Sequence, residues 1–244
     1  MKYEKIIKGQ FIARPNRFIA EIKLNHSGEV TRAHVRNTGR CRELLQPGCT
    51  VYLEDHTERM GSRTLAYTLI AVEKILPGGG TLLVNMDSLA PNKAAAEALY
   101  DGIIRLPGME KLSVIRREKA WGDSRFDFYV EDEEGRKGFI EVKGVTLEED
   151  GLVRFPDAPT ERGVKHLHEL VKARKEGYFA CALFIVQMEG MQVFLPNDDT
   201  HKEFGDALRE AAAQGVEVLA YQCHVTEDTL HVAELLPVKL SLKD

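Results

Sequence analysis

The first third of the chain alternates apolar and polar residues over short stretches that turn signals interrupt. Alternation runs through residues 11–24 and resumes at residue 29, after the turn residues 25–28. Further strand-like runs occupy 49–54, 64–73 and 81–85, separated by Gln46-Pro47-Gly48 and by residues 77–80. Short strands at this spacing predict a small barrel or sandwich over residues 1–85. A five-stranded OB-type barrel fits the length, and other small β folds fit as well.

The pattern changes after residue 85, where helices and strands begin to alternate. An Ala-rich helix is predicted over 93–102, capped by Pro91-Asn92 and stopped by Gly102. Thr160 is predicted to cap a second helix that ends before Gly177, and a third helix covers 200–214. Apolar runs at 112–117, 152–155, 179–187 and 216–225 predict strands between them. Residues 86–244 therefore predict a second domain with a mixed central sheet, and the whole chain an α/β (mixed α+β) fold.

Residues 124–143 predict a β-hairpin that carries the main candidate chemistry. The runs S-R-F-D-F-Y-V and F-I-E-V-K flank an acidic, Gly-containing turn. If the turn is centred near Glu134, Asp127 lies across from Glu141 with Cβ atoms about 5 Å apart. Glu141 and Lys143 share one face of their strand because side chains alternate. Two carboxylates this close stay ionised on a half-buried sheet only if a cation lies between them, which predicts a metal site beside a lysine.

Composition and charge refine this picture. Hydrophobic residues make up 43% of the chain and charged residues 29%, values typical of a globular protein. The beginning of the chain lacks the apolar region of a secretory signal, and the longest apolar run is too short to span a bilayer, so we expect a cytoplasmic protein without a membrane partner. The four cysteines form no C-x-x-C pair, and Cys181 and Cys223, which lie inside apolar strand-like runs, are expected to be buried free thiols.

The charge is distributed unevenly between the two predicted domains. Residues 1–85 hold 13 Lys and Arg against 8 Asp and Glu, a balance of +5, and residues 86–244 hold 20 against 30, a balance of −10. A basic module beside an acidic one suggests an anionic partner such as nucleic acid. An ordinary solvated surface is the alternative.

The segment 31–42 concentrates the positive charge of the first domain. It contains four arginines, no acid and the turn signal N-T-G. Arginine forks, loop amides and a hydroxyl suit phosphate oxygens, which makes Arg36, Thr38, Arg40 and Arg42 candidate nucleic-acid contacts. A basic, solvated hairpin without a ligand explains the same residues equally well.

The order of these motifs resembles two known groups of proteins. A helix with Glu97, a strand with Asp127 and a strand with Glu141 and Lys143 resemble the PD-(D/E)xK nuclease superfamily. More closely, four segments resemble the sugar fermentation stimulation protein A (SfsA) family. They are H-V-R-N-T-G-R-C-R-E-L-L-Q-P-G at 34–48, S-R-F-D-F at 124–128, E-V-K-G-V-T-L at 141–147 and F-P-D-A-P-T-E-R-G-V-K-H-L at 155–167. The resemblance implies an N-terminal OB-type domain, a C-terminal nuclease-like domain and DNA binding.

Metal-assisted phosphodiester hydrolysis is the mechanism that this resemblance implies. Asp127 and Glu141 would hold Mg²⁺ or Mn²⁺, with Glu97 as a direct or water-mediated ligand, and Glu118 is an alternative to Glu97. Lys143 would orient a water molecule or stabilise the anion. Oxygen ligands suit these ions, and the motif contains no Cys/His set of the kind that zinc favours.

Two further residues are candidates for contact with the scissile phosphate. Arg162 and His166 lie one turn apart on the polar side of the helix that follows the motif strands. For His166, a surface or capping histidine is an equally good interpretation.

The sequence thus favours a divalent-metal-dependent nuclease that acts on single- or double-stranded DNA, with RNA as a further candidate. A non-catalytic DNA-binding regulator of sugar (maltose) metabolism on a nuclease-like scaffold is the alternative, and a single-strand binding module is a third. The oligomeric state, including a homodimer, stays open.

Overall fold

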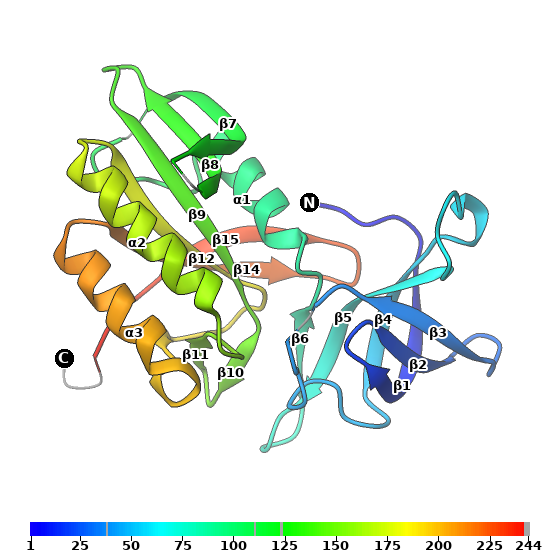
Figure 1. Cartoon of the computed structure of the whole chain (residues 1–244). Helices are drawn as coiled ribbons and strands as arrows, with labels where there is room; N and C mark the ends of the chain where they lie inside the picture. Colours follow the sequence, from blue (N-terminus) through cyan, green and yellow to red (C-terminus); the bar gives the residue numbers. More distant parts are fainter. Residues whose placement is uncertain (38, 110, 123, 242–244) are drawn as a thin grey trace.

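The structure is a computed structural model that describes residues 1–37, 39–109, 111–122 and 124–241. Two lobes lie side by side in Figure 1, one made by residues 6–85 and the other by residues 90–236. The last strand of the first lobe leads into the helix that opens the second.

The first lobe is a closed barrel. Its strands pair in the order β3-β2-β1-β4-β5, and β3 also pairs in parallel with β5, which closes the ring. A sixth strand, β6, continues antiparallel from β5 toward the second lobe. Five strands closed in this order form the OB-type barrel that the sequence predicts. The bounds are β1 (Ile6–Asn16), β2 (Ile19–Leu24), β3 (Val30–Val35), β4 (Thr50–Asp55), the 3₁₀ turn η1 (Thr57–Arg59), β5 (Tyr67–Ile75) and β6 (Thr81–Asn85).

The second lobe is built on a six-stranded mixed sheet in the order β15-β14-β12-β9-β8-β7. Strands β7, β8 and β9 are antiparallel neighbours, β9, β12 and β14 run parallel, and β15 closes the edge antiparallel to β14. This confirms the predicted mixed sheet. The bounds are β7 (Leu112–Trp121), β8 (Ser124–Asp132), β9 (Lys137–Val145), β12 (Phe179–Val186), β14 (Glu217–Val225) and β15 (Leu230–Leu236), with β10 (Leu147–Glu149), β11 (Leu152–Phe155) and β13 (Val193–Pro196) in a small separate sheet.

In the part of the chain that the structure describes, three helices cover this sheet. α1 (Ala90–Tyr100) packs against β9 and β15 on one face, and α2 (Glu161–Lys175) and α3 (Asp198–Ala213) lie side by side on the other (Figure 1). The Thr160 side chain accepts the Gly163 N–H at 3.1 Å, and Gly177 has a φ of +90°, so α2 has the predicted cap and stop. Among the described residues, no helix combines the length and the apolar character that crossing a membrane requires.

Three details differ from the sequence prediction. The alternating run 11–24 is not one strand but contains a hairpin between Asn16 and Ile19. The sequence pattern did not show this turn, because a tight turn leaves the period of two undisturbed. Asn92 lies inside α1, whose N-cap is Leu89. Strand β15 lies in a stretch for which we predict no element, and pairing with β14 supplies the stability that its own pattern does not indicate.

The two lobes share buried contacts. Lys74 of β5 donates from Nζ to the Glu148 carbonyl at 2.7 Å and pairs with the buried Glu148 carboxylate. Gln187, at the end of β12, donates from Nε2 to Asn85 Oδ1 at 2.8 Å, and Asn85 donates from Nδ2 to the Tyr3 hydroxyl at 2.9 Å. Because satisfied buried polar groups are costly to separate, the barrel is held in one position relative to the hairpin β8–β9.

Candidate functional site

The hairpin β8–β9 brings the two predicted carboxylates together. Its register pairs Phe128 with Ile140 and Glu131 with Lys137, so the turn is centred at Glu134 and Asp127 comes opposite Glu141. Past the Phe128–Ile140 pair, the Val142 N–H of β9 bonds to a side chain and not to a backbone carbonyl of β8. Oδ2 of Asp127 accepts this N–H at 2.8 Å. Its Oδ1 accepts from Asn92 Nδ2 at 2.6 Å. Both oxygens of Asp127 are therefore held in place, one by β9 and one by α1.

Glu141 lies at the centre of the group and is 4% exposed. Its Oε1 accepts from Lys143 Nζ at 2.7 Å and from His166 Nδ1. The Arg162 Nε–H donates to His166 Nε2 at 3.4 Å. Since Nε2 accepts a hydrogen bond, this contact favours a proton on Nδ1, where it faces Glu141. The polar side of α2 is thus the side that faces the carboxylates, and His166 is buried there rather than at the surface.

The environments of the two carboxylates push their pKa values in opposite directions. Burial raises the pKa of Asp127 above its usual value, and the negative charge of Glu141 raises it further. Burial acts the same way on Glu141, but the His166 hydrogen bond and the Lys143 charge outweigh it and hold the Glu141 pKa below its usual value. Acid and base roles are divided in this way at many active sites.

One atom of the group fits a cation. Glu141 Oε2 is buried and has no hydrogen-bond partner among the described residues. A buried carboxylate oxygen without a donor is costly, and a cation between it and Asp127 would satisfy it. The metal ligands available here are carboxylate oxygens, which suit Mg²⁺ or Mn²⁺. We refer to Asp127, Glu141, Lys143 and His166 as the carboxylate centre.

Glu97 does not join the carboxylate centre, which corrects its predicted position. Its side chain is 52% exposed, and its carboxylate lies 2.6 Å from the Met1 amino group. Five residues separate it from Asn92 on α1, so the two side chains point about 140° apart around the helix axis. Glu118 does not replace it, because its exposed carboxylate lies 3.4 Å from Nη1 of Arg125.

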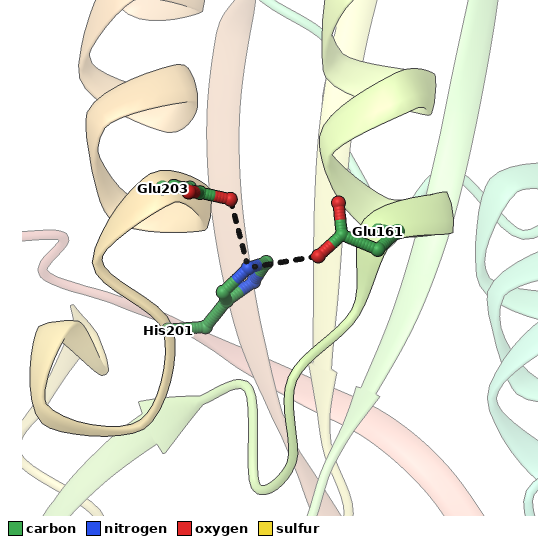
Figure 2. Close-up of side chains that lie close together, drawn as sticks. All are labelled: Glu161, His201 and Glu203. Carbon is green, nitrogen blue, oxygen red and sulfur yellow. Dashed lines mark ion pairs between the residues drawn. The ribbon is translucent and has the colours of Figure 1, made fainter.

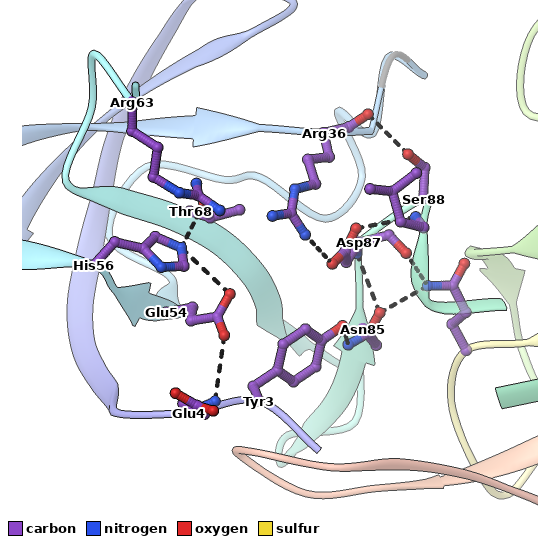
Figure 3. A network of polar contacts seen from close by, with 12 residues as sticks. Tyr3, Glu4, Arg36, Glu54, His56, Arg63, Thr68, Asn85, Asp87 and Ser88 are labelled. Carbon is purple, nitrogen blue, oxygen red and sulfur yellow. Dashed lines mark hydrogen bonds and ion pairs between the residues drawn. The ribbon is translucent and has the colours of Figure 1, made fainter. Parts of the chain in front are cut away.

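The basic segment 31–42 also differs from its predicted arrangement. Arg36 points inward, and its Nη1 lies 2.6 Å from Oδ2 of Asp87, a residue that is 1% exposed (Figure 3). Thr38 lies outside the described residues. Arg40 and Arg42 are exposed, so nucleic-acid contact through them stays a prediction.

Sequence reasoning missed two residues that organise the site. Asn92 was expected to cap a helix, whereas its side chain orients Asp127 across 35 residues of sequence. Asp87 links the barrel to α1, because its Oδ1 accepts the Leu89 N–H at 3.0 Å while its Oδ2 binds Arg36. The one local signal was the pair of polar residues, Asp87 and Asn92, on either side of the beginning of an Ala-rich helix.

A second group of potential metal ligands lies between α2 and α3. His201 Nε2 is 3.5 Å from Oε1 of Glu161 and 3.5 Å from Oε2 of Glu203 (Figure 2). The Thr160 N–H points to His201 Nδ1 at 3.4 Å, which places the proton of a neutral ring on Nε2, the atom that a metal would need. Both glutamates are exposed. We therefore interpret this group as a polar contact between two helices.

Comparisons with known proteins agree with the two lobes. A family model described as "Sugar fermentation stimulation protein RE domain" matches residues 89–229, and one described as "SfsA N-terminal OB domain" matches residues 12–82. A "Sugar fermentation stimulation protein homolog" of Desulfitobacterium hafniense (strain Y51) is 50% identical over 240 residues, which cover 98% of this chain and 99% of that protein. A homolog from Clostridium acetobutylicum is 47% identical over 241 residues, which cover 98% of this chain and 100% of that protein.

A solved structure extends the comparison to three dimensions. "The structure of Pyrococcus Furiosus SfsA in complex with Ca2+" superposes with a TM-score of 0.83 at 27% identity and covers 98% of each chain. The family models together span most of the chain, and the relatives match it nearly from end to end. The chain belongs to the sugar fermentation stimulation protein (SfsA) family.

Proposed function

We propose that this chain is a divalent-metal-dependent nuclease that hydrolyses phosphodiester bonds of DNA. The observation that carries the proposal is the buried Oε2 of Glu141, unpartnered within the described part of the chain, beside the fixed carboxylate of Asp127. Asp127 and Glu141 would hold Mg²⁺ or Mn²⁺. When bound, such an ion neutralises phosphate charge and makes water a stronger acid. The structure of the Pyrococcus furiosus relative is described as a Ca²⁺ complex, and Ca²⁺ likewise prefers oxygen ligands.

The other residues of the centre have roles that follow from their contacts. Asn92 and the Val142 N–H hold Asp127 in one orientation. His166 fixes Oε1 of Glu141 through Nδ1–H and is itself held by Arg162, so we regard His166 as a positioning residue. Lys143 keeps an ammonium next to Glu141, and this group has three N–H donors, of which some can serve an incoming phosphate.

The resemblance to PD-(D/E)xK nucleases supports the same assignment. The order of Asp127, the hairpin turn, Glu141 and Lys143 is the order of that motif, and the structure places the three side chains on one face of β8 and β9. The OB-type barrel would bind the DNA strand, and Arg40 and Arg42 are exposed on its surface.

The test is an incubation of purified protein with labelled single- and double-stranded DNA and RNA in Mg²⁺, Mn²⁺ or EDTA. We expect metal-dependent cleavage of DNA that falls at least about 100-fold in Glu141→Gln, which removes the charge of a proposed metal ligand, and in Lys143→Met, which removes the ammonium offered to the phosphate. Glu217→Gln, a conservative change on β14 outside the centre, is the matched control and should cleave like the wild type. Absence of cleavage on every substrate, with DNA binding intact in all variants, would favour the non-catalytic regulator.

A further inference from the structure

A cavity of about 380 Å³ lies where the N-terminal segment, the barrel and α1 meet. Cationic side chains outnumber acidic ones on its wall, although the chain as a whole has a net charge of −5. We call this cavity the basic pocket. Its charged lining residues are Lys2, Arg36, Arg59, Arg63 and Lys93, with Glu4 and Glu54 as the acids.

Two of these cations lack an acidic partner within the described ranges. Arg36 is paired with Asp87, Arg59 with Glu4, and Lys2 with Asp228 at 3.2 Å. The Arg63 side chain, in contrast, donates only to the Thr68 hydroxyl, at 3.3 Å (Figure 3), and the Lys93 side chain has no polar partner among the described residues. Arg63 and Lys93 are therefore available to an anion, and their charges are not cancelled locally.

Two histidines report the positive field of the pocket. Burial lowers the pKa of His34, and Arg36 and Arg63 lower it further. Burial also lowers the pKa of His56, and Arg63, Arg36 and Arg59 add to this effect against the opposing pull of Glu54. Burial is thus the main reason why the pKa of each imidazole is lowered, and the neighbouring arginine charges act in the same direction.

The basic pocket lies next to the carboxylate centre. Lys93 and Asn92 are consecutive residues in the first turn of α1, and Asn92 donates to Asp127 at 2.6 Å. Successive side chains on a helix point about 100° apart, so this turn presents a cation to the pocket and an amide to the centre. One turn of α1 therefore contributes to both the basic pocket and the carboxylate centre.

We propose that the basic pocket binds a backbone phosphate of the polynucleotide whose cleavage at the carboxylate centre is proposed above, and this inference rests on that function. Arg63 and Lys93 make the direct contacts, and Arg36 adds the donors that Asp87 does not use. Guanidinium forks and an ammonium around a small cavity match phosphate oxygens in charge and in geometry. An acidic peptide would satisfy the same cations, but it would bring nothing to the carboxylate centre beside them.

The test uses a double variant, Arg63→Ala with Lys93→Ala, in the full chain. Neither substitution leaves a carboxylate without its partner, whereas Arg36→Ala would leave the buried Asp87 without its cationic partner. The matched control is Arg117→Ala with Lys175→Ala, which removes the same charge from exposed sites outside the pocket. Binding of a labelled single-stranded oligodeoxynucleotide is followed by fluorescence anisotropy in EDTA over a range of salt concentrations, so that cleavage does not interfere.

We expect the double variant to bind about tenfold more weakly, with a salt slope of log affinity smaller by about 0.7 for each phosphate that the protein no longer neutralises. The control should keep the wild-type affinity and slope. Wild-type binding by the double variant would overturn the inference even if the wild type cleaves DNA. Weakened binding in the double variant would support it even if no substrate is cleaved. Polyglutamate that displaces the oligonucleotide from the wild type but not from the double variant would assign the pocket to an acidic peptide and overturn the inference.

Discussion

Helix α2 contributes one residue to each of two histidine–glutamate contacts. His166 of α2 contacts Glu141, and Glu161 of α2 contacts His201 of α3. The two contacts differ in their surroundings. At the carboxylate centre, His166 and Glu141 are both buried, and one oxygen of Glu141 has no donor in the described part of the chain. Between α2 and α3, His201 meets Glu161 and Glu203, which are both exposed to water. Water satisfies the second group at little cost, whereas burial leaves the first group in need of a ligand.

The comparison shows that a list of potential ligands is a weak guide to a metal site. The exposed group brings three ligand atoms close together, but its imidazole proton lies on the atom that would have to bind the metal. The carboxylate centre offers fewer free atoms, yet their orientations are fixed by Asn92, Val142 and Arg162. Fixed ligands lose little freedom on binding, which favours the buried centre.

The largest expected difference concerns cation affinity. Glu141→Gln removes the charge of the buried carboxylate and should weaken Mg²⁺ or Mn²⁺ binding by about 100-fold or more. Glu161→Gln with Glu203→Gln should leave the affinity unchanged. Isothermal titration of each protein with Mn²⁺ measures both. Equally weakened binding in the two variants would reverse our assignment of the metal site.

A smaller difference is expected between the two histidines. His166→Ala deprives the buried Glu141 of a hydrogen bond and should lower the free energy of unfolding by about 1–3 kcal/mol. It should also reduce cleavage by about 10–100-fold, as the removal of residues that orient metal ligands does. His201→Ala removes contacts with two exposed glutamates and the long hydrogen bond from the Thr160 N–H, and it should cost less than about 1 kcal/mol. Chemical denaturation and cleavage assays provide the two measurements, and His166→Gln, which can still donate to Glu141, should recover part of the cleavage.

The smallest effect is a pH dependence that only the buried centre should show. The folded protein raises the pKa of Asp127, so this group stabilises the metal-free fold increasingly as pH falls through that value. The folded protein lowers the pKa of Glu141, so its contribution is complete above the ordinary Glu pKa and is lost at lower pH, through its depressed value. As pH falls from neutral, protons therefore compete with a metal at Asp127 first.

The measurement is the rise in Tm that saturating Mg²⁺ produces at a series of pH values. We expect this rise to shrink by a few degrees as pH falls through the raised pKa of Asp127, since about 1 kcal/mol shifts Tm by roughly 2–4 °C at this chain length. Asp127→Asn should show little rise at any pH. A rise that does not change with pH in the wild type would contradict competition between protons and metal.

Local pattern was sufficient to predict much of the fold and part of the site. Period-two alternation predicted the register of 124–143 and thus the meeting of Asp127 with Glu141, because the turn length leaves one pairing that buries the apolar face. Thr160 and Gly177 marked the ends of α2 for an equally local reason, since a helix must satisfy its terminal backbone groups.

Residues far apart in sequence required the tertiary structure. The sequence predicts that Glu97 lies on a helix, but only the tertiary structure shows that its carboxylate faces the Met1 amino group. The pattern of 31–42 contains four arginines, and only the fold shows that Arg36 turns inward to Asp87.

The sequence by itself determined which side chains share a strand or a helix face, because backbone geometry repeats over a few residues. The tertiary structure alone decided what lies across from each face. It brought Asn92 to Asp127, buried His166 against Glu141 and left Oε2 of Glu141 without a donor from the described residues. Burial and long-range pairing are properties of the packed chain, and these set the charge and the demand for a cation on which the proposed chemistry depends.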